Sequence, residues 1–424
     1  MDITVYEEVV VPNIINSYLT GTPTYTTIAN SSDGINHPRD LDFHTILAKR
    51  ELWVVNKETE NNGGTTVTIS DAGMPGQTSE LRQDGNAWHF MSLPTGIAFG
   101  DNTNFATSPG VLDANHNGGS FTGPSLWSSD PNIYAQPSGG NGSHLDMLHA
   151  SPYSMGICHE VGNAYWVFDG HNGNIVRYDF VEDHGPGNDY HGDAIVRRYT
   201  EVTVQRDGNE VPSHLILDKE TGWLYIVDNG NDRVIRMDIN SGSIGGNLPL
   251  VNEQLAQYVW MTGATVETVV NTGLTQPSGI DIIHNRLIVS DHSNGDIIIY
   301  DISNMPATEL GRIQTGSAGV QGIKIGPDGR IWYVNAQENT VMHIEPENVT
   351  SIEETPAEVQ ISLFPNPTTG LLAVHHSFDN SDRLTAIVYD ILGEEVLSTT
   401  VPTGNQATFD FSELSGGVYM MVID

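Results

Sequence analysis

Residues 211–238 read VPSHLILDKETGWLYIVDNGNDRVIRMD and show the unit from which most of this chain is built. Three apolar runs, at residues 215–217, 223–227 and 233–237, are separated by polar turns that contain Asp, Gly and Asn. Short runs rich in Val, Ile, Leu, Trp and Tyr between turn-forming residues are typical of β-strands. The stretch therefore predicts three consecutive short strands.

The same unit recurs along the chain about every 50 residues. Its first strand begins at Pro38, Pro94, Pro152, Pro212, Pro277 and Val320. Its second strand recurs as LWVVN, YWVFD, LYIVD, LIVSD and IWYVN, and its third as NIVRYD, RVIRMD, DIIIYD and TVMHIE. One small sheet cannot bury both of its faces alone, so the copies are expected to pack as the blades of a β-propeller. The six starts predict an all-β fold with six blades.

The units run Pro-x-Gly-Ile, then Leu-Tyr-Val-x-Asp, then Asn-x-x-Ile, and in this they resemble NHL-repeat propellers over residues 38–345. One enzyme of that type, the peptidyl-hydroxyglycine amidating lyase, holds zinc with a His after the Pro of three blades. None of the six starts here has a His at that position. The resemblance therefore implies the fold and not the lyase site.

The chain is expected to contain two domains joined by a short linker. We assign residues 1–346 to the propeller, with Thr24–Ala29 (TYTTIA) as the strand that completes the last blade, because an open ring would leave strand edges unpaired. Residues 347–359 are polar and acidic, as in a linker. Residues 360–424 alternate apolar and polar positions between turns, which predicts a small immunoglobulin-like β-sandwich.

Three ordered motifs in this last segment resemble the C-terminal sorting domain of the type IX secretion system of Bacteroidetes. They are FPNP with Gly370, VYD with Gly393 and Val396, and Leu414 followed by GGVY. The resemblance implies export by the type IX machinery to the medium or the outer cell surface. Family members usually continue into a further strand, whereas this chain stops at Asp424, so we expect a truncated domain or a short last strand.

The composition excludes several classes of partner. The chain has 53 acidic and 17 basic residues, a net charge of -36, which repels nucleic acid and anionic membrane surfaces but attracts divalent cations. No apolar run approaches the roughly 20 residues that span a bilayer. The single cysteine, Cys158, excludes an internal disulfide and is expected to be a buried structural thiol.

A first candidate site lies in the central channel, which the first strand of each blade lines. The aligned positions are Asp40, Gly96, Ser154, His214, Gly279 and Gly322. With the neighbouring Arg39 and Tyr153, Asp40 and His214 form a candidate catalytic group that could bind an anion or a metal, or act as an acid–base pair. The alternative is a hydrogen-bonded plug that fills the channel.

A second candidate is a metal site for Zn²⁺ or Ca²⁺. The insertion at residues 182–193 (EDHGPGNDYHGD) supplies Asp183, His184, Asp189, His191 and Asp193. Mixed imidazole and carboxylate ligands suit zinc, and carboxylates alone suit calcium; the alternative is a solvated acidic loop.

The segment HLDMLH offers a further, smaller set of metal ligands. On an extended strand His144 and Asp146 share one face and His149 points to the other, so all three meet one ion only if the strand contains a bulge.

Ligand-binding candidates come from loops and turns. Trp127 and Tyr134 lie in a long insertion of the second blade, and His171 and His292 occupy equivalent turns of two blades. A third insertion, in the fourth blade, is expected to form a short helix at residues 250–259.

Motifs of catalytic nucleophiles and of phosphate-binding loops are absent from the sequence. The residues thus favour a secreted or cell-surface module that binds a small molecule, a peptide or a glycan. The alternative is a metal-assisted lyase or hydrolase at the channel mouth.

Overall fold

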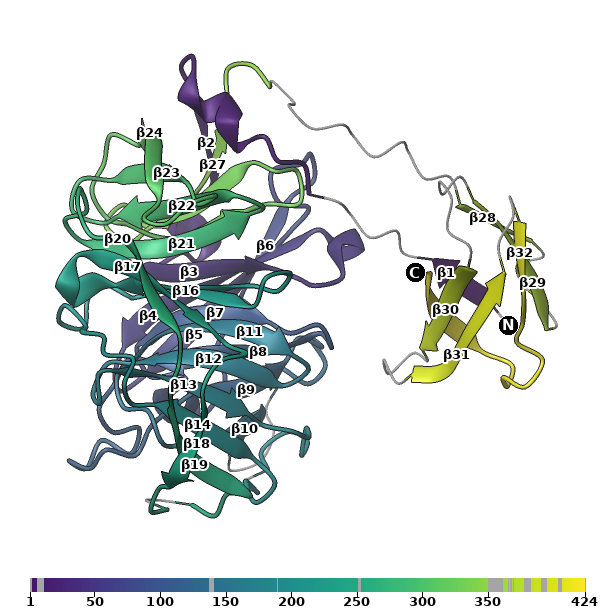
Figure 1. Cartoon of the computed structure of the whole chain (residues 1–424), viewed down its shortest axis with the longest axis horizontal. Coiled ribbons are helices and arrows are strands. Elements are labelled where there is room, and N and C mark those ends of the chain that lie inside the picture. The colour runs from purple at the N-terminus through teal and green to yellow at the C-terminus, as the bar shows by residue number, and fades with distance from the viewer. Residues whose placement is uncertain are drawn as a thin grey trace. The chain divides into compact units, whose positions relative to one another are not determined.

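The computed structural model describes residues 2–5, 11–136, 141–188, 190–250, 253–349 and 361–423, except 365, 367, 369, 377–382, 390–394 and 403–405. The chain divides into two compact units, one of Asn13–Thr350 and one of Met1–Pro12 with Ser351–Asp424. Both units consist almost entirely of strands (Figure 1). In the part of the chain that is described, no helix has the length and apolar character needed to cross a membrane.

The larger unit is a six-bladed β-propeller, as the repeat predicts. The first blade contains β3 (Pro38–Phe43), β4 (Glu51–Thr59), β5 (Gly63–Ser70) and β6 (Thr78–Arg82). The second contains β7 (Pro94–Phe99), β8 (Asn104–Pro109), β9 (Ser125–Ser128) and β10 (His144–Met147). The third contains β11 (Ser154–Val161), β12 (Ala164–Asp169), β13 (Asn174–Asp179) and β14 (Ile195–Tyr199).

The remaining blades follow the same antiparallel order. The fourth contains β15 (Leu215–Asp218), β16 (Trp223–Asp228), β17 (Arg233–Asp238) and β20 (Val266–Val270). The fifth contains β21 (Pro277–Ile283), β22 (Arg286–Asp291), β23 (Asp296–Asp301) and β24 (Thr308–Gln314). The sixth contains β25 (Val320–Ile325), β26 (Ile331–Asn335), β27 (Thr340–Glu345) and β2 (Thr24–Ala29).

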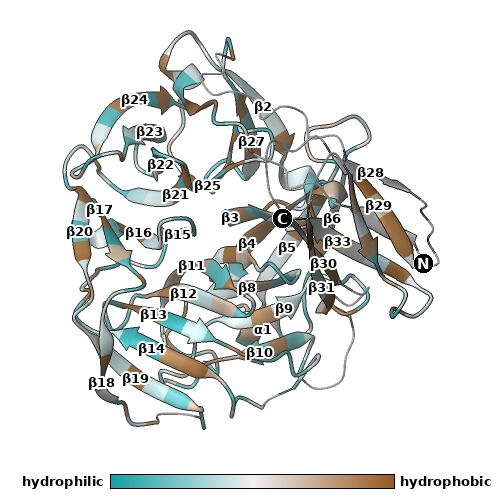
Figure 2. Ribbon diagram, turned by 45° about the vertical axis from the view of Figure 1, so that its right-hand side comes forward, coloured by the Kyte–Doolittle hydropathy of each residue, from teal (hydrophilic) through white to brown (hydrophobic). Residues whose placement is uncertain are grey.

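The ring is closed by its first strands and by β2. Each first strand packs on the next in the order β3, β7, β11, β15, β21, β25 and back to β3, around the middle of the propeller in Figure 2. β2 pairs antiparallel with β27, with Tyr25 opposite Ile344, so a strand from near the start of the chain forms the outer edge of the last blade. This pairing removes an exposed edge from β27.

The insertion of the fourth blade forms a hairpin and not a helix. Its strands are β18 (Ser243–Asn247) and β19 (Gln257–Thr262), and β19 pairs in parallel with β14. The third blade therefore has six strands, two of them from the next blade's insertion. The expected helix at residues 250–259 is wrong because the segment's end, QYVWMT, has β-branched and aromatic residues that pair with the open edge of β14.

The smaller unit consists of two sheets. One has the order β1-β33-β30-β31 and the other β28-β29-β32. The strands are β1 (Asp2–Val5), β28 (Ile361–Phe364), β29 (Leu371–His376), β30 (Arg383–Tyr389), β31 (Glu395–Pro402), β32 (Gln406–Asp410) and β33 (Val418–Ile423).

The two sheets of this unit share one apolar core, to which Val374 and Phe409 contribute from one sheet and Val388 and Met421 from the other. β1 pairs in parallel with β33. The first residues of the chain thus belong to this unit, whereas we had assigned residues 1–346 as a whole to the propeller.

Candidate functional site

The central channel is closed by side chains from opposite blades. Asp40 Oδ1 of the first blade lies 3.6 Å from His214 Nδ1 of the fourth, and each residue is only 4% exposed. His214 Nε2 is 2.8 Å from the carbonyl oxygen of Thr95, and Asp40 Oδ2 accepts a hydrogen bond of 3.1 Å from the N–H of Ile97. Burial raises the pKa of Asp40, an effect that His214 opposes.

Glycine makes room for this arrangement. A Cβ atom at Gly322, on β25, would collide with Asp40 Oδ1 and with the Asp40 backbone. A Cβ at Gly279, on β21, would likewise collide with the carbonyl oxygen of Gln321. The space that the small residues leave is therefore filled by neighbouring strands and by the Asp40 side chain.

Arg39 extends the same plug. Its guanidinium contacts the backbone carbonyl of Glu210 and lies 3.3 Å from both Glu210 Oε2 and Gln321 Oε1. Burial lowers the pKa of Arg39 to about 10, although Glu210 opposes the shift. Tyr153 lies under the guanidinium of Arg206, with 3.9 Å between Cζ and the ring centroid.

These contacts favour the alternative to a catalytic group at the channel mouth. Each of the buried polar side chains Arg39, Asp40 and His214 is engaged in a hydrogen bond with a residue of another blade. Buried polar groups that pair in this way hold blades together. The plug is the alternative that the structure favours.

Trp127 and Tyr134 are core residues, so their assignment to a ligand surface is also corrected. Both are fully buried and pack with Phe105. The indole N–H of Trp127 donates to Thr107 Oγ1 at 2.9 Å, and the phenol of Tyr134 is 3.1 Å from Thr66 Oγ1. The second blade has short outer strands, and these two rings fill its interior.

Among its described residues, the insertion at residues 182–193 does not gather its acidic and histidine side chains around one point. Asp183 accepts the N–H of Gly185 within its own turn at 2.7 Å, and His184 Nε2 pairs with Asp193 Oδ1 at 2.8 Å. Asp189 lies outside the described residues. A single ion bound by all five side chains is therefore not what the fold provides.

His144 is also directed away from any shared ligand position. β10 contains a register shift between His144 and Asp146, so the strand does have a bulge. The His144 ring stacks on Phe90 at 3.6 Å, and Nδ1 is 2.8 Å from the carbonyl oxygen of Asn141. Burial lowers the pKa of His144 to about 4, which keeps the ring neutral.

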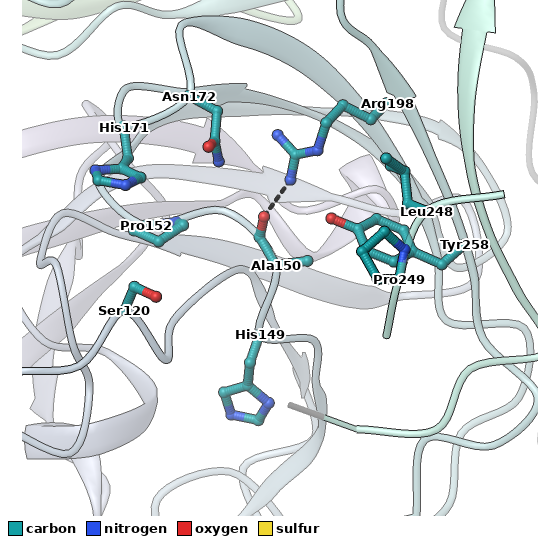
Figure 3. A pocket seen from close by; sticks show the side chains of 10 residues that line it. All are labelled: Ser120, His149, Ala150, Pro152, His171, Asn172, Arg198, Leu248, Pro249 and Tyr258. Atoms are coloured by element: carbon teal, nitrogen blue, oxygen red, sulfur yellow. Dashed lines mark hydrogen bonds between the residues drawn. The ribbon is translucent and has the colours of Figure 1, made fainter. Parts of the chain in front are cut away.

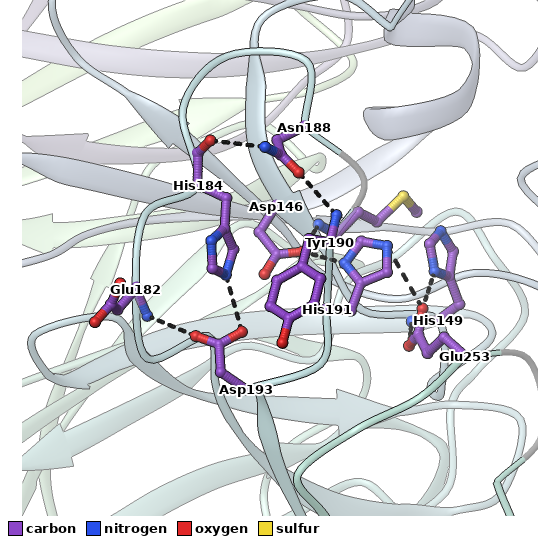
Figure 4. A network of polar contacts seen from close by, with 10 residues as sticks. Asp146, His149, Glu182, His184, Asn188, Tyr190, His191, Asp193 and Glu253 are labelled. Carbon is purple, nitrogen blue, oxygen red and sulfur yellow. Dashed lines mark hydrogen bonds and ion pairs between the residues drawn. The ribbon is translucent and has the colours of Figure 1, made fainter.

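Three residues from distant parts of the sequence do converge: His149, His191 and Glu253 (Figure 4). His149 Nδ1 is 2.6 Å from Glu253 Oε2, and His191 Nε2 is 3.9 Å from the same oxygen. Their possible ligand atoms all lie within 4.8 Å of one another. We call this group the histidine–glutamate cluster.

Asp146 lies behind the cluster and holds one of its rings. Its Oδ1 is 2.5 Å from His191 Nδ1, and the residue is 0% exposed. Burial raises the pKa of Asp146, and the neighbouring His191 opposes the rise. His191 and Asp146 belong to two separate candidate sets in the sequence, and His149 follows the end of β10, so it has no strand face. Glu253 was missed because no spacing links residue 253 to residues 146–191.

A cavity of about 270 Å³ adjoins His149 (Figure 3). It is lined by Ser120, His149, Ala150, Pro152, His171, Asn172, Arg198, Leu248, Pro249 and Tyr258. These residues come from the loop between β8 and β9, the loop before β11, the turn between β12 and β13, the strand β14 and the β18–β19 hairpin. We call it the hairpin cavity, because the added hairpin supplies one wall.

Arg198 is the most constrained group of this cavity. Its guanidinium contacts Asp169 Oδ2 at 2.5 Å, Asn174 Oδ1 at 2.7 Å and the carbonyl oxygen of Ala150. Asp169 and other neighbours raise the pKa of Arg198 although burial opposes them, so the side chain stays charged. A cation fixed in this way presents a rigid wall to a ligand.

The two histidines of equivalent turns have different surroundings. His171 lines the hairpin cavity. His292 does not, and burial lowers its pKa.

A second, larger cavity of about 430 Å³ lies between the last and the first blade, where Phe43, Met74, Trp332 and His343 contribute to its wall.

Comparison with known proteins identifies the smaller unit. Residues 362–424 match the family described as secretion system C-terminal sorting domain, which confirms the resemblance seen in the motifs. The sorting domain marks the chain for export by a secretion system to the outer surface or the medium. No curated protein matches the chain.

Solved structures are similar to this chain over most of its length. An auxiliary nutrient binding protein from Bacteroides thetaiotaomicron is 11% identical with a TM-score of 0.51, and the match covers 77% of this chain and 78% of that one. An auxiliary nutrient binding protein from Bacteroides ovatus is 11% identical with a TM-score of 0.49 and 78% coverage of both chains. At this identity the likeness shows the fold alone.

Proposed function

We propose that this chain is an extracellular binding protein and that its ligand occupies the hairpin cavity. The observation that supports the proposal is a hollow walled by a buried, hydrogen-bonded Arg198 together with the exposed polar side chains of Ser120, His171 and Asn172 from two loops. Concave sites with a few fixed polar groups among apolar surfaces are typical of small-molecule recognition.

The wall chemistry favours a neutral, polar ligand. The charge of Arg198 is balanced by Asp169, whose Oδ2 lies 2.5 Å from the guanidinium. The N–H groups of Arg198 therefore have fixed directions, and the side chain adds little net positive field to the cavity. The hydroxyl of Tyr258 and the amide of Asn172 add neutral donors and acceptors, and the ring of His171 adds further polar atoms. The net charge of -36 opposes the approach of anions.

The size of the cavity narrows the ligand further. About 270 Å³ accommodates a group as large as one sugar ring or one amino-acid side chain, and Pro152, Leu248 and Pro249 provide apolar contact for its faces. We therefore propose that the cavity receives a sugar residue, free or at the end of a glycan. The description of the Bacteroides thetaiotaomicron structure as nutrient binding motivates this choice of probes.

The proposal is tested by binding measurements with matched histidine variants. Isothermal titration of the full chain with a panel of neutral mono- and oligosaccharides is expected to identify a ligand. His171→Ala, in the cavity, should weaken that ligand about ten-fold, a loss of about 1.4 kcal/mol. His292→Ala, in the equivalent turn outside the cavity, should leave the affinity unchanged.

Two results would overturn the proposal. One is a panel in which no sugar binds. The other is a sugar whose affinity is unaffected by His171→Ala but lost in Met74→Glu, which fills the second cavity with a charged side chain. In that case the ligand site lies between the last and first blades.

A further inference from the structure

We propose that His149, His191 and Glu253 bind one divalent transition-metal ion, and that Zn²⁺ is the ion that fits the ligand set best. This metal site goes beyond the ligand-binding function and does not depend on it. Two imidazoles and one carboxylate form a set of three protein ligands found in zinc sites that keep a further position open.

The spacing of the cluster is close to what a metal requires. With metal–ligand bonds of roughly 2.0–2.2 Å, tetrahedral ligand atoms lie roughly 3–3.5 Å apart. Glu253 Oε2 is 2.6 Å from His149 Nδ1 and 3.9 Å from His191 Nε2. To bind one metal ion, the distance to His149 must increase and the distance to His191 must decrease, each by under about 1 Å. Rotation of the Glu253 carboxylate alone changes both distances.

Asp146 prepares His191 as a ligand. The contact between Asp146 Oδ1 and His191 Nδ1, at 2.5 Å, fixes the ring so that Nε2 faces Glu253. A carboxylate that holds the far nitrogen of a histidine is the usual support of a metal ligand, because it sets the ring orientation and raises its basicity. Asp146 Oδ1 therefore supports the site without being a ligand.

The two buried carboxylates at the cluster also favour a bound cation. The side chains of Asp146 and Glu253 are 0% and 9% exposed. Within the described residues, their hydrogen bonds and ion pairs go to imidazoles and backbone N–H groups, with no Lys or Arg among them. Two buried carboxylates beside two imidazoles are costly without a positive charge, and a divalent ion supplies it.

Three separate segments build the cluster. His149 precedes β11, His191 precedes β14, and Glu253 precedes β19, so each residue sits just before a strand of the enlarged third sheet. The N–H of His149 donates to Glu253 Oε1 at 2.7 Å, which fixes the hairpin's loop to the second blade's last segment.

Imidazole ligands favour Zn²⁺ over Ca²⁺, which takes oxygen ligands.

The test is a zinc titration of the full chain after treatment with a chelator. The wild type should bind one equivalent of Zn²⁺ by calorimetry and retain it after gel filtration, as measured by elemental analysis. Zn²⁺ should also raise its melting temperature. His191→Ala and Glu253→Gln should each weaken zinc binding at least about ten-fold, and Asp146→Asn about 10–100-fold.

Matched controls separate this site from its surroundings. His184→Ala, in the same insertion as His191 but paired with Asp193, should bind zinc like the wild type. His171→Ala should lose sugar affinity and keep zinc, so a failure of the ligand proposal leaves this test intact. Circular dichroism and melting of each variant without metal show whether it is folded.

Zinc binding that is equal in wild type, His191→Ala and Glu253→Gln would overturn the proposal. So would a folded wild type that takes up no zinc, which would make the cluster a purely ionic contact between the hairpin and the second blade. If His191→Ala fails to fold, the near-isosteric Glu253→Gln decides between these outcomes.

Discussion

At the scale of single residues, the histidines of this propeller differ in charge state and in partners according to their surroundings. His44 and His144 are buried and His89 is half-buried, and burial lowers the pKa of each, to about 3 for His44 and about 4 for the other two. His149 and His191 instead face carboxylates. The same side chain thus serves as a neutral core group at some positions and as a candidate metal ligand at others.

His44 makes the stability of the folded chain depend on pH. Its Nδ1 accepts the N–H of Ile46 at 3.0 Å, which only the neutral ring can do, and burial and the nearby Lys49 lower its pKa from 6.5 to about 3. The unfolded chain takes up a proton near pH 6.5 and the folded chain only near pH 3. The stability from His44 is therefore present above pH 6.5 and is lost progressively as the pH falls from 6.5 towards 3.

We expect the free energy of unfolding to fall by about 2 kcal/mol through His44 between about pH 7.5 and about pH 5. Urea unfolding of the wild type and of His44→Gln at both pH values measures this contribution. The variant should lose less stability on acidification than the wild type. Equal losses in the two proteins would contradict the assignment of a neutral, buried His44.

At the scale of elements, the β18–β19 hairpin joins two blades and builds the site. β19 adds to the edge of β14, and Val259 and Met261 enter the core shared by the third and fourth blades. The hairpin also supplies Leu248, Pro249 and Tyr258 to the hairpin cavity, and the loop between its strands carries Glu253 of the cluster. One inserted element thus contributes to both proposed sites.

Removal of this hairpin should leave the propeller folded and abolish both proposed binding sites. Ser241 Oγ accepts the N–H of Thr265 at 2.8 Å, so deletion of residues 242–263 can join Ser241 to Ala264 in a short turn. The shortened chain should keep its β-rich circular dichroism spectrum and lose about 2–5 kcal/mol with the buried side chains of Val259 and Met261. It should lose zinc and sugar binding together. Retained zinc binding would show that Glu253 is not a ligand.

At the scale of the whole molecule, the chain combines a β-propeller with an export signal. The propeller unit, Asn13–Thr350, has its own closed ring of blades, and the sorting unit has its own core. Two units with separate cores are expected to fold independently. The pairing of β1 with β33 adds the first residues of the chain to the sorting unit.

Deletion of residues 351–424 should therefore leave the propeller folded and abolish export in a type IX host. The shortened protein, purified from cytoplasm, should melt at the temperature of the full chain's propeller transition. Western blots of the culture medium and cell surface measure export. Unchanged export, or a propeller that no longer folds, would contradict the division of roles between the two units.

Much of the scaffold could be predicted from the residue pattern. The six starts from Pro38 to Val320 lie within three residues of the observed starts of the first strands, and Thr24–Ala29 pairs with β27. These features are local: strand length, apolar runs and turn residues act within a few neighbours and repeat along the chain. The motifs of the sorting domain are equally local, so residues 362–424 were recognisable without a structure.

The residue pattern could not predict how the channel residues pack or which residues form the histidine–glutamate cluster. Position on the repeat placed Asp40 and His214 in the channel, but only packing showed that they meet at 3.6 Å and close it. His149, His191 and Glu253 come from segments without periodicity, joined because a hairpin of one blade extends the sheet of another. Spacing along a chain describes neighbours within one element, whereas contact between inserted loops depends on which strand edges they find in three dimensions.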